Sequence, residues 1–241
     1  MDSKVLIVQN VTREEPGLLK EILEEKEQGY QIVNLEAGDA IPELKGYSAL
    51  VVLGGTQSAN DDTEHMRLLT KRVAEALKLG LPYLGICLGL QVLVKAAGGT
   101  VVPSPVKEIG WRDASGEIHE IELTEEGKND DLFSQVMGER FPIFHLHNET
   151  VELTDAMTLL ATGKNCQNQV VRVGNAFGVQ GHFEVTPALF DKLVAEDEEL
   201  RQISATELKS DFQKVEKEFH EFGKQVLKNF LSIAAFEYYT S

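Results

Sequence analysis

The sequence predicts an α/β fold: a doubly wound, mostly parallel sheet with helices on both faces, antiparallel strands at its edge, and a helical C-terminal tail. Three observations predict it. Short apolar runs alternate with amphipathic segments over residues 4–97, which is typical of repeated β-α-β units. Several runs are nearly continuous in apolar residues, as buried parallel strands are. After Gly98 and Gly99 shorter alternating segments follow, and from residue 187 the apolar spacing is helical.

The first half of the chain supplies the parallel strands and their helices. Apolar runs predict strands, and an apolar spacing of three to four residues predicts helices. The predicted strands are 4–8, 30–35, 48–53 and a short run between Pro82 and Cys87, and the predicted helices are 16–27, 63–79 and 88–97.

The second half adds strands and the tail. Residues 100–102 and 118–123 are predicted to be antiparallel edge strands, 142–146 and 158–161 are further short strands, and 169–173 and 177–180 form a hairpin around Gly174 and Asn175. Trp111, the one tryptophan, is expected to be partly buried in a core rather than to line a pocket. The tail, 187–239, is expected to pack over the sheet, with a homodimer surface as the alternative.

The composition indicates the number of domains, the kinds of partner and the cellular location to expect. The 241 residues, 42% apolar, are enough for a sizeable core, and we expect one domain over residues 1–241 with 187–241 as a helical extension. A net charge of -16 argues against nucleic acid and anionic membranes as partners. Two cysteines make no disulfide framework, and no signal or spanning segment is evident. The expected location is therefore cytoplasmic.

The segment around Cys87 joins a predicted strand to a predicted helix. Gly85 and Gly89 stand two residues to either side, so the backbone can turn sharply. Such a turn lifts the thiol clear of the sheet and leaves the amide of Leu88 free to donate to an oxyanion. Cys87 is the candidate nucleophile, and a small buried hydrophobe is the alternative. Cys166 lacks these features, and we expect it to be inert.

A second glycine-rich loop, Gly54-Gly55-Thr56-Gln57-Ser58, follows the third predicted strand. In doubly wound folds ligands bind beyond the carboxyl ends of the strands, which is where this loop is predicted to lie. Adjacent glycines can point a backbone amide into such a site, so Gly55 is the candidate second oxyanion donor and Gly54 a candidate substrate-binding residue. An ordinary strand-to-helix turn is the alternative.

His182 and Glu184 follow the predicted hairpin. Residues two apart on a strand face the same side, so the imidazole and the carboxylate should project together. With Cys87 they complete the nucleophile, base and orienting carboxylate that acyl transfer needs. For an isolated H-x-E the alternative is a surface pair.

Two segments carry a resemblance to a known family. LGICLGLQ at residues 84–91 and GVQGHFEV at residues 178–185 resemble the nucleophile and histidine-glutamate segments of class I (triad) glutamine amidotransferases. The resemblance is to the stand-alone proteins similar to the amidotransferase domain of GMP synthase, and it extends to about Thr186. It implies that Cys87 is the nucleophile, His182 the base, Glu184 its partner, and Gly55 and Leu88 the oxyanion donors.

The resemblance also implies a reaction. Glutamine would be hydrolysed through a Cys87 thioester, without a cofactor, to glutamate and ammonia. Gln91 would hold the amino acid end of the substrate, and His147, Asn148 and Glu149 fall where the family positions glutamine. No nucleotide-binding phosphate loop is evident, so if the ammonia is delivered to an acceptor, a separate synthetase subunit must supply that second site.

Three departures from the family pattern lie beside the triad. Leu90, Gly181 and Phe183 stand where many members have His, Phe and Pro. The triad itself is intact, so the departures bear on the shape of the pocket, and they lie close enough to the triad in sequence to reshape its rim.

Three other interpretations stay open. A hydrolase of γ-glutamylated amines would use the same triad, and a catalytically weak regulatory or binding subunit would not need it intact. A zinc site could be built from His145, His147, His182 and Glu184, because zinc takes three or four such ligands. Nothing in their spacing forces the two pairs together, so no metal is predicted.

Overall fold

The computed structural model describes residues 4–240, with side chains described up to residue 235. Its strands are β1 (Lys4–Gln9), β2 (Tyr30–Asn34), β3 (Tyr47–Val52), β4 (Tyr83–Ile86), β5 (Thr100–Gly110), β6 (Glu120–Leu123), β7 (Arg140–Pro142), β8 (His145–Glu152), β9 (Thr158–Gly163), β10 (Val170–Val173) and β11 (Ala176–Val179). Its helices are α1 (Gly17–Glu25), α2 (Glu64–Leu79), α3 (Leu88–Ala96), α4 (Glu125–Lys128), α5 (Pro187–Glu196) and α6 (Ala205–Thr240), with short 3-10 turns η1 (Asp131–Phe133) and η2 (Leu200–Gln202).

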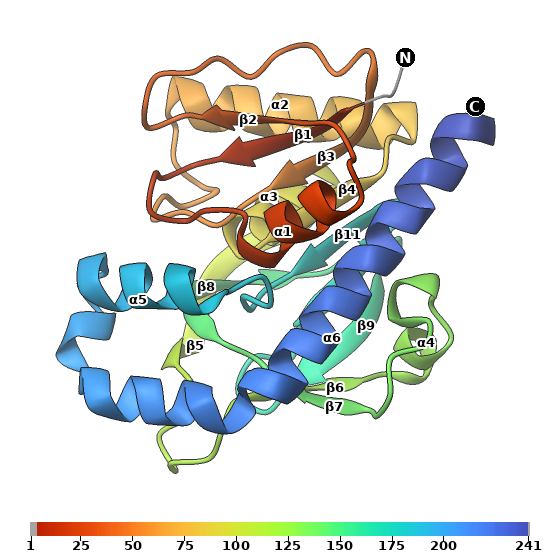
Figure 1. Ribbon diagram of the computed structural model, residues 1–241. Helices are drawn as coiled ribbons and strands as arrows, with labels where there is room; N and C mark the ends of the chain where they lie inside the picture. The colour runs from red at the N-terminus through yellow and green to blue at the C-terminus, as the bar shows by residue number, and fades with distance from the viewer. Residues whose placement is uncertain (1–3, 241) are drawn as a thin grey trace.

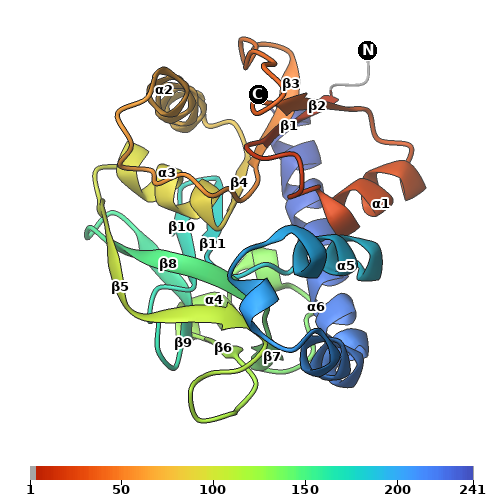
Figure 2. The same ribbon diagram turned by 90° about the vertical axis from the view of Figure 1, so that its left-hand side faces the viewer.

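The central element is a nine-stranded sheet in the order β2-β1-β3-β4-β11-β10-β9-β6-β7. From β2 to β11 neighbouring strands run parallel, and from β11 to β7 they run antiparallel. Helices α1 and α6 cover one face and α2 and α3 cover the other (Figures 1 and 2). The predicted fold class is confirmed.

Strand β1 shows why both faces are covered. Alternate side chains on a strand point to opposite faces. Val5 and Ile7 lie in the hydrophobic core that includes α1 and α6, whereas Leu6 and Val8 lie in the core formed with α2 and α3. All four are almost completely buried, so the strand has no polar face.

One part of the predicted strand order is wrong. Residues 100–102 begin β5, which is longer than predicted and pairs with β8 as a separate two-stranded sheet instead of joining the edge of the large one. The register between β5 and β8 shifts between Pro103 and Glu108, where the prolines cannot donate to a ladder. Residues 142–146 are likewise not one strand, because β7 ends at Pro142 and β8 begins at His145.

The long helix α6 crosses one face of the sheet diagonally (Figure 1). Its side chains Phe212 and Phe219 pack on Trp111, together with Phe144 and Phe190 from the body of the fold. Trp111 is only 1% exposed, so it is more completely buried than expected. None of the described helices is both long and apolar enough to cross a membrane.

Candidate active site

Cys87 occupies the turn between β4 and α3. Its backbone has φ 51° and ψ -105°, a conformation that a residue with a side chain rarely adopts. The two flanking glycines, Gly85 and Gly89, allow β4 and α3 to pack in close contact. A Cβ atom on Gly85 would collide with the backbone of Gly89, and one on Gly89 would collide with the carbonyl oxygen of Val52 in β3.

The thiol of Cys87 is buried but lines a cavity. The residue is 5% exposed, and its Sγ lies 3.8 Å from the carbonyl oxygen of Leu146 and 3.8 Å from the amide nitrogen Nε2 of Gln180. The carbonyl oxygen can accept the thiol proton, and the amide N–H can donate to the sulfur. Segments far apart in the sequence therefore converge on this atom.

His182 and Glu184 lie beyond the end of β11, in an extended segment that is not part of the strand. The His182 backbone N–H donates to the carbonyl of Phe144, and ring atom Nδ1 lies 2.8 Å from Oε1 of Glu184. Burial alone would favour the neutral ring, but the negative charge of Glu184 and the hydrogen bond with Cys87 outweigh it. The pKa of His182 is therefore raised well above its ordinary value.

Gly55 and Leu88 are neighbours in space. Leu88 is the first residue of α3, where a helix leaves its backbone N–H without an intrahelical partner. A Cβ built on Gly55 would lie 3.0 Å from Cδ2 of Leu88. The two loops thus lie side by side at the carboxyl ends of β3 and β4, as their position in the sequence predicts.

A cavity of about 580 Å³ opens above Cys87. The predicted residues that line it are Gly55, Cys87, Gln91, His147, Asn148 and Glu149. His182, Glu184 and Leu88 are almost completely buried behind this lining. Gly54 is also buried, and because it has no side chain, the carboxyl of Glu14 and the ring of His182 can lie against it. A Cβ atom on Gly54 would collide with the Glu14 carboxyl and would lie 2.9 Å from Cε1 of His182.

The start of β8 forms one side of the cavity. Gln91 Nε2 donates to the carbonyl oxygen of Glu149 at 3.3 Å, which ties α3 to β8. The Glu149 carboxylate in turn accepts from the hydroxyl of Ser58 at 3.0 Å. Asn148 is exposed, whereas the ring of His147 is occupied by buried partners.

The three departures from the family pattern do not lie at the rim. Leu90 and Phe183 are fully buried, and neither they nor Gly181 line the cavity. Leu90 packs directly against Gly178, where any side chain would collide with it. A side chain at Gly181 would collide with Ile143. The expectation that they alter the rim is therefore wrong, because all three belong to the packing beneath the site.

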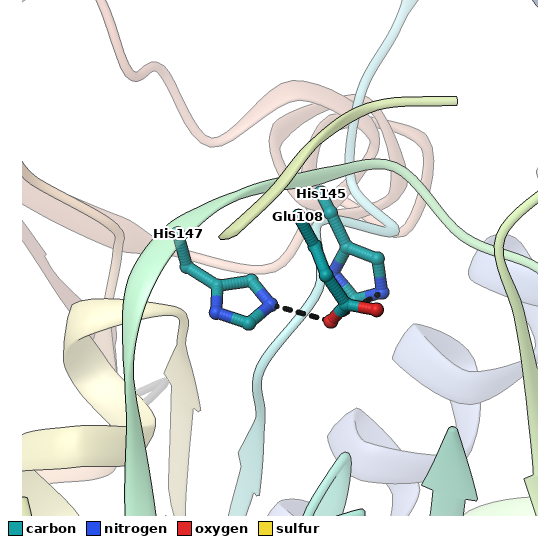
Figure 3. A group of neighbouring side chains, drawn as sticks. All are labelled: Glu108, His145 and His147. Atoms are coloured by element: carbon teal, nitrogen blue, oxygen red, sulfur yellow. Dashed lines mark hydrogen bonds and ion pairs between the residues drawn. The ribbon is translucent and has the colours of Figure 1, made fainter. Parts of the chain in front are cut away.

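Glu108 of β5 meets His145 and His147 of β8 in a buried group (Figure 3). Oε2 of Glu108 lies 2.9 Å from Nε2 of His147 and 3.7 Å from Nε2 of His145. Nδ1 of His147 lies 3.0 Å from the carbonyl oxygen of Glu149, which can only accept, so that nitrogen carries a proton. Burial lowers the pKa of His145 well below its usual value, and this ring is neutral.

This trio has the donor atoms and spacing of a zinc site, with all ligand atoms within 4.8 Å of one another. It is not the set considered from the sequence: His182 and Glu184 pair with each other instead and do not join it. The spacing of the chain could not indicate Glu108, because β5 and β8 come together only through their pairing.

Two residues near Cys87 were missed by the sequence analysis. Glu14 lines the cavity from the loop after β1, and Gln180 reaches the sulfur from the segment after β11. The carboxyl ends of β1, β3 and β4 lie at the same edge of the sheet. Because ligands bind at that edge, a polar residue just beyond β1 could have been predicted to lie near the site, and Glu14 is such a residue.

A sharp turn that presents a buried thiol beside a His-Glu pair, on a doubly wound sheet, is the arrangement of α/β enzymes with a nucleophile elbow. The profile of the family "Glutamine amidotransferase class-I" matches residues 18–201. The chain belongs to this family. Family membership supports a cysteine-dependent enzyme that hydrolyses or transfers the amide of glutamine, in general terms.

Individual relatives agree with this assignment. The glutamine amidotransferase-like protein YfeJ of Salmonella typhimurium is 33% identical over 178 residues, which cover 70% of this chain and 71% of that protein. The glutamine-hydrolysing GMP synthase of Thermosipho africanus is 34% identical over 124 residues, which cover 50% of this chain but 22% of that protein.

Solved structures resemble the whole chain. A glutamine amidotransferase of Thermotoga maritima has a TM-score of 0.84 at 26% identity, covering 97% of this chain and 99% of that one. A second, from Methylobacillus flagellatus, has a TM-score of 0.85 at 23% identity, covering 97% of this chain and 96% of that one, and shows the same fold.

Proposed function

We propose that the protein hydrolyses the side-chain amide of glutamine through a thioester on Cys87. The observation that carries the proposal is the 2.8 Å contact between His182 and Glu184 behind a thiol held at a positive φ. Such a triad supplies a nucleophile, a proton carrier and an orienting carboxylate.

In this proposal the thiol proton of Cys87 passes to His182, Sγ attacks the amide carbon, and a carbon–sulfur bond replaces the carbon–nitrogen bond. His182 gives its proton to the leaving nitrogen, which departs as ammonia. Water then attacks the thioester with His182 as base, and glutamate leaves as the thiol is restored. The backbone N–H groups of Gly55 and Leu88 would donate to the oxyanion in both steps.

The remaining predicted residues would bind the amino acid end. Gln91 lines the cavity beside Glu149, and the backbone of His147, Asn148 and Glu149 forms its side. Gly54 would act indirectly, by leaving space for the imidazole. We also infer an ammonia-accepting synthetase partner in a reducing, cytoplasmic setting, supported by the similarity to glutamine-hydrolysing GMP synthases.

Release of glutamate from glutamine by the purified chain tests the proposal. Cys87→Ser should lower turnover by about 10³-fold or more, because a hydroxyl is a poor nucleophile in a site built for a thiolate. Cys166→Ser is the matched control: Cys166 lies on the loop between β9 and β10, outside the cavity, and should keep full activity.

Trapping distinguishes an enzyme from a binding subunit. A glutamine-like electrophile should modify Cys87 once per chain and abolish turnover. Full turnover by Cys87→Ser, or no glutamate release from glutamine by the wild type, would overturn the proposal.

A further inference from the structure

The cavity above Cys87 is larger than the amide of glutamine requires. Its volume of about 580 Å³ lies within the roughly 300–1,000 Å³ of pockets that hold drug-sized ligands. The leaving group of glutamine is ammonia, so no part of that substrate extends beyond the scissile nitrogen. The cavity therefore has room for a larger leaving amine.

One wall of the cavity is acidic. It consists of Glu14, after β1, and of Glu196, Asp197, Glu198 and Glu199 at the end of α5, and we call these five residues the acidic wall. The loop after β1 is held against α5 by hydrogen bonds from Lys192 to Thr12 and Glu15, and Figure 2 shows α5 beside α1.

Part of this negative charge is not paired with a cation. Arg13 is the one cationic Lys or Arg side chain in the cavity lining, and its Nη2 is bound to Asp197 at 2.7 Å. Glu199 pairs with Lys107 at 2.8 Å. Glu196 and Glu198 are exposed, and neither forms an ion pair with a residue that the structure describes.

Glu14 gives a second observation, separate from the charge of the wall, that indicates a ligand. The residue is 7% exposed, and its Oε2 has no hydrogen-bond partner among the described residues. Its carboxyl lies over Gly54 next to the edge of the His182 ring, at the nucleophile end of the cavity. Burial raises the pKa of Glu14, with the nearby His182 only partly opposing this. A buried carboxyl oxygen without a hydrogen-bond partner is costly, and a cation in the cavity would offset that cost.

We propose that the acidic wall is a subsite for an ammonium group on the leaving half of the substrate, so that the site takes γ-glutamylated diamines or polyamines. The inference rests on the proposed thioester chemistry and extends it to a larger leaving group. The γ-glutamyl half keeps its contacts with Cys87, Gly55 and Leu88, and the amine half lies along the wall.

The reaction balances as it does for glutamine. The amide carbon–nitrogen bond breaks, His182 protonates the leaving nitrogen, and the free amine departs where ammonia would. Water hydrolyses the thioester to glutamate. No oxidant or metal is required, and water is the co-substrate.

Two matched substrates test the subsite. γ-Glutamyl-diaminobutane ends in an ammonium, and in γ-glutamyl-pentylamine a methyl group replaces that ammonium. They share the γ-glutamyl half and the chain length, so the ratio of their kcat/KM values isolates the distal charge. We expect a ratio of about tenfold or more in favour of the cationic substrate, equivalent to about 1.4 kcal/mol, and a smaller ratio at high salt.

Variants of the acidic wall test which carboxylates cause the preference for the cationic substrate. Glu14→Gln and the double variant Glu196→Gln/Glu198→Gln should each bring the ratio several-fold closer to one. The control is Glu218→Gln/Glu221→Gln, which removes the same charge from the exposed surface of α6, outside the cavity, and should leave the ratio unchanged.

The outcomes separate the two proposals. Glutamine turnover with equal kcat/KM values for the two amines would overturn the subsite and leave the proposed function standing. No turnover of glutamine or of either amine would overturn the proposed function itself. A cationic preference that survives both wall variants would overturn the assignment to these carboxylates.

Discussion

Cys87, His182 and Glu14 follow three different strands of one sheet and meet at its edge. The sequence could indicate Cys87 and His182 because each lies in a local pattern, a glycine-flanked turn and an H-x-E. Glu14 lies in no such pattern. Its place beside His182 depends on the parallel pairing of β1 with β3, and on a glycine at position 54. Contacts of this kind are tertiary, and a local pattern does not predict them.

The charge on His182 makes stability depend on pH. Because folding raises its pKa above 6.5, protonation of the ring stabilises the fold below that pH, and the contribution is lost as the pH rises through the folded-state pKa. Glu184→Gln removes the main partner of the charged ring. The difference in free energy of unfolding between wild type and variant should therefore be greatest below the ordinary His pKa of about 6.5 and should shrink as the pH rises through the folded-state pKa.

Urea unfolding at constant ionic strength measures this difference. Glu25→Gln, which removes an exposed carboxylate from α1, is the control and should show no such trend. A difference that grows as the pH rises would contradict the assignment of the charged pair.

The two thiols should differ in reactivity. Both cysteines are free and buried, but Cys87 lines the cavity, and burial raises the pKa of Cys166. Near neutral pH iodoacetamide should therefore modify Cys87 at least about tenfold faster than Cys166. Mass spectrometry of the two peptides gives the rates, and saturating glutamine should slow only the first. Equal rates in the folded protein would count against Cys87 as the nucleophile.

At the scale of elements, the turn between β4 and α3 depends on close packing against β3. Gly89→Ala places a Cβ atom against the carbonyl oxygen of Val52, a backbone group of β3 that cannot move aside. We expect a loss of about 1–3 kcal/mol in the free energy of unfolding, with reduced activity. Gly29→Ala is the matched control, because its Cβ would meet only the flexible chain of Lys4, at 3.2 Å. Equal denaturation midpoints for the two variants would show that the turn tolerates a side chain.

The pairing of β5 with β8 brings Glu108 to His145 and His147, and chelation tests whether a metal there matters. If the triad alone carries the chemistry, activity should survive a zinc chelator and should fall by about 10² to 10⁴ in His182→Ala. Loss of activity on chelation and its return with added zinc would assign a role to the trio instead.

The elements themselves were largely predictable, because apolar periodicity is a local property. The parallel strands, the helices between them and the 170–179 hairpin all lie where their patterns place them. The partner of a strand is not local. Residues 100–102 alternate as an edge strand would, yet they pair with β8 in a second sheet that also carries one side of the cavity.

At the scale of the whole molecule, α6 joins the tail to the rest of the fold. Phe212 and Phe219 contact Trp111, so the fluorescence of the one tryptophan reports on this junction. If residues 1–241 form one domain, the unfolding transitions seen by tryptophan fluorescence and by far-ultraviolet circular dichroism should coincide. Phe219→Ala should shift the two transitions equally and should lower the free energy of unfolding by about 3–5 kcal/mol. Two separate transitions would make the tail a unit of its own.

The backbone angle at Cys87 also bears on how such a protein evolves. A left-handed conformation is least strained for glycine, so substitution of Cys87 by glycine would relax the turn. Selection for thermal tolerance alone would then favour loss of the thiol, and selection for chemistry must oppose it in every generation. A cysteine at this angle, where glycine would be less strained, is therefore expected only in a protein that uses the thiol.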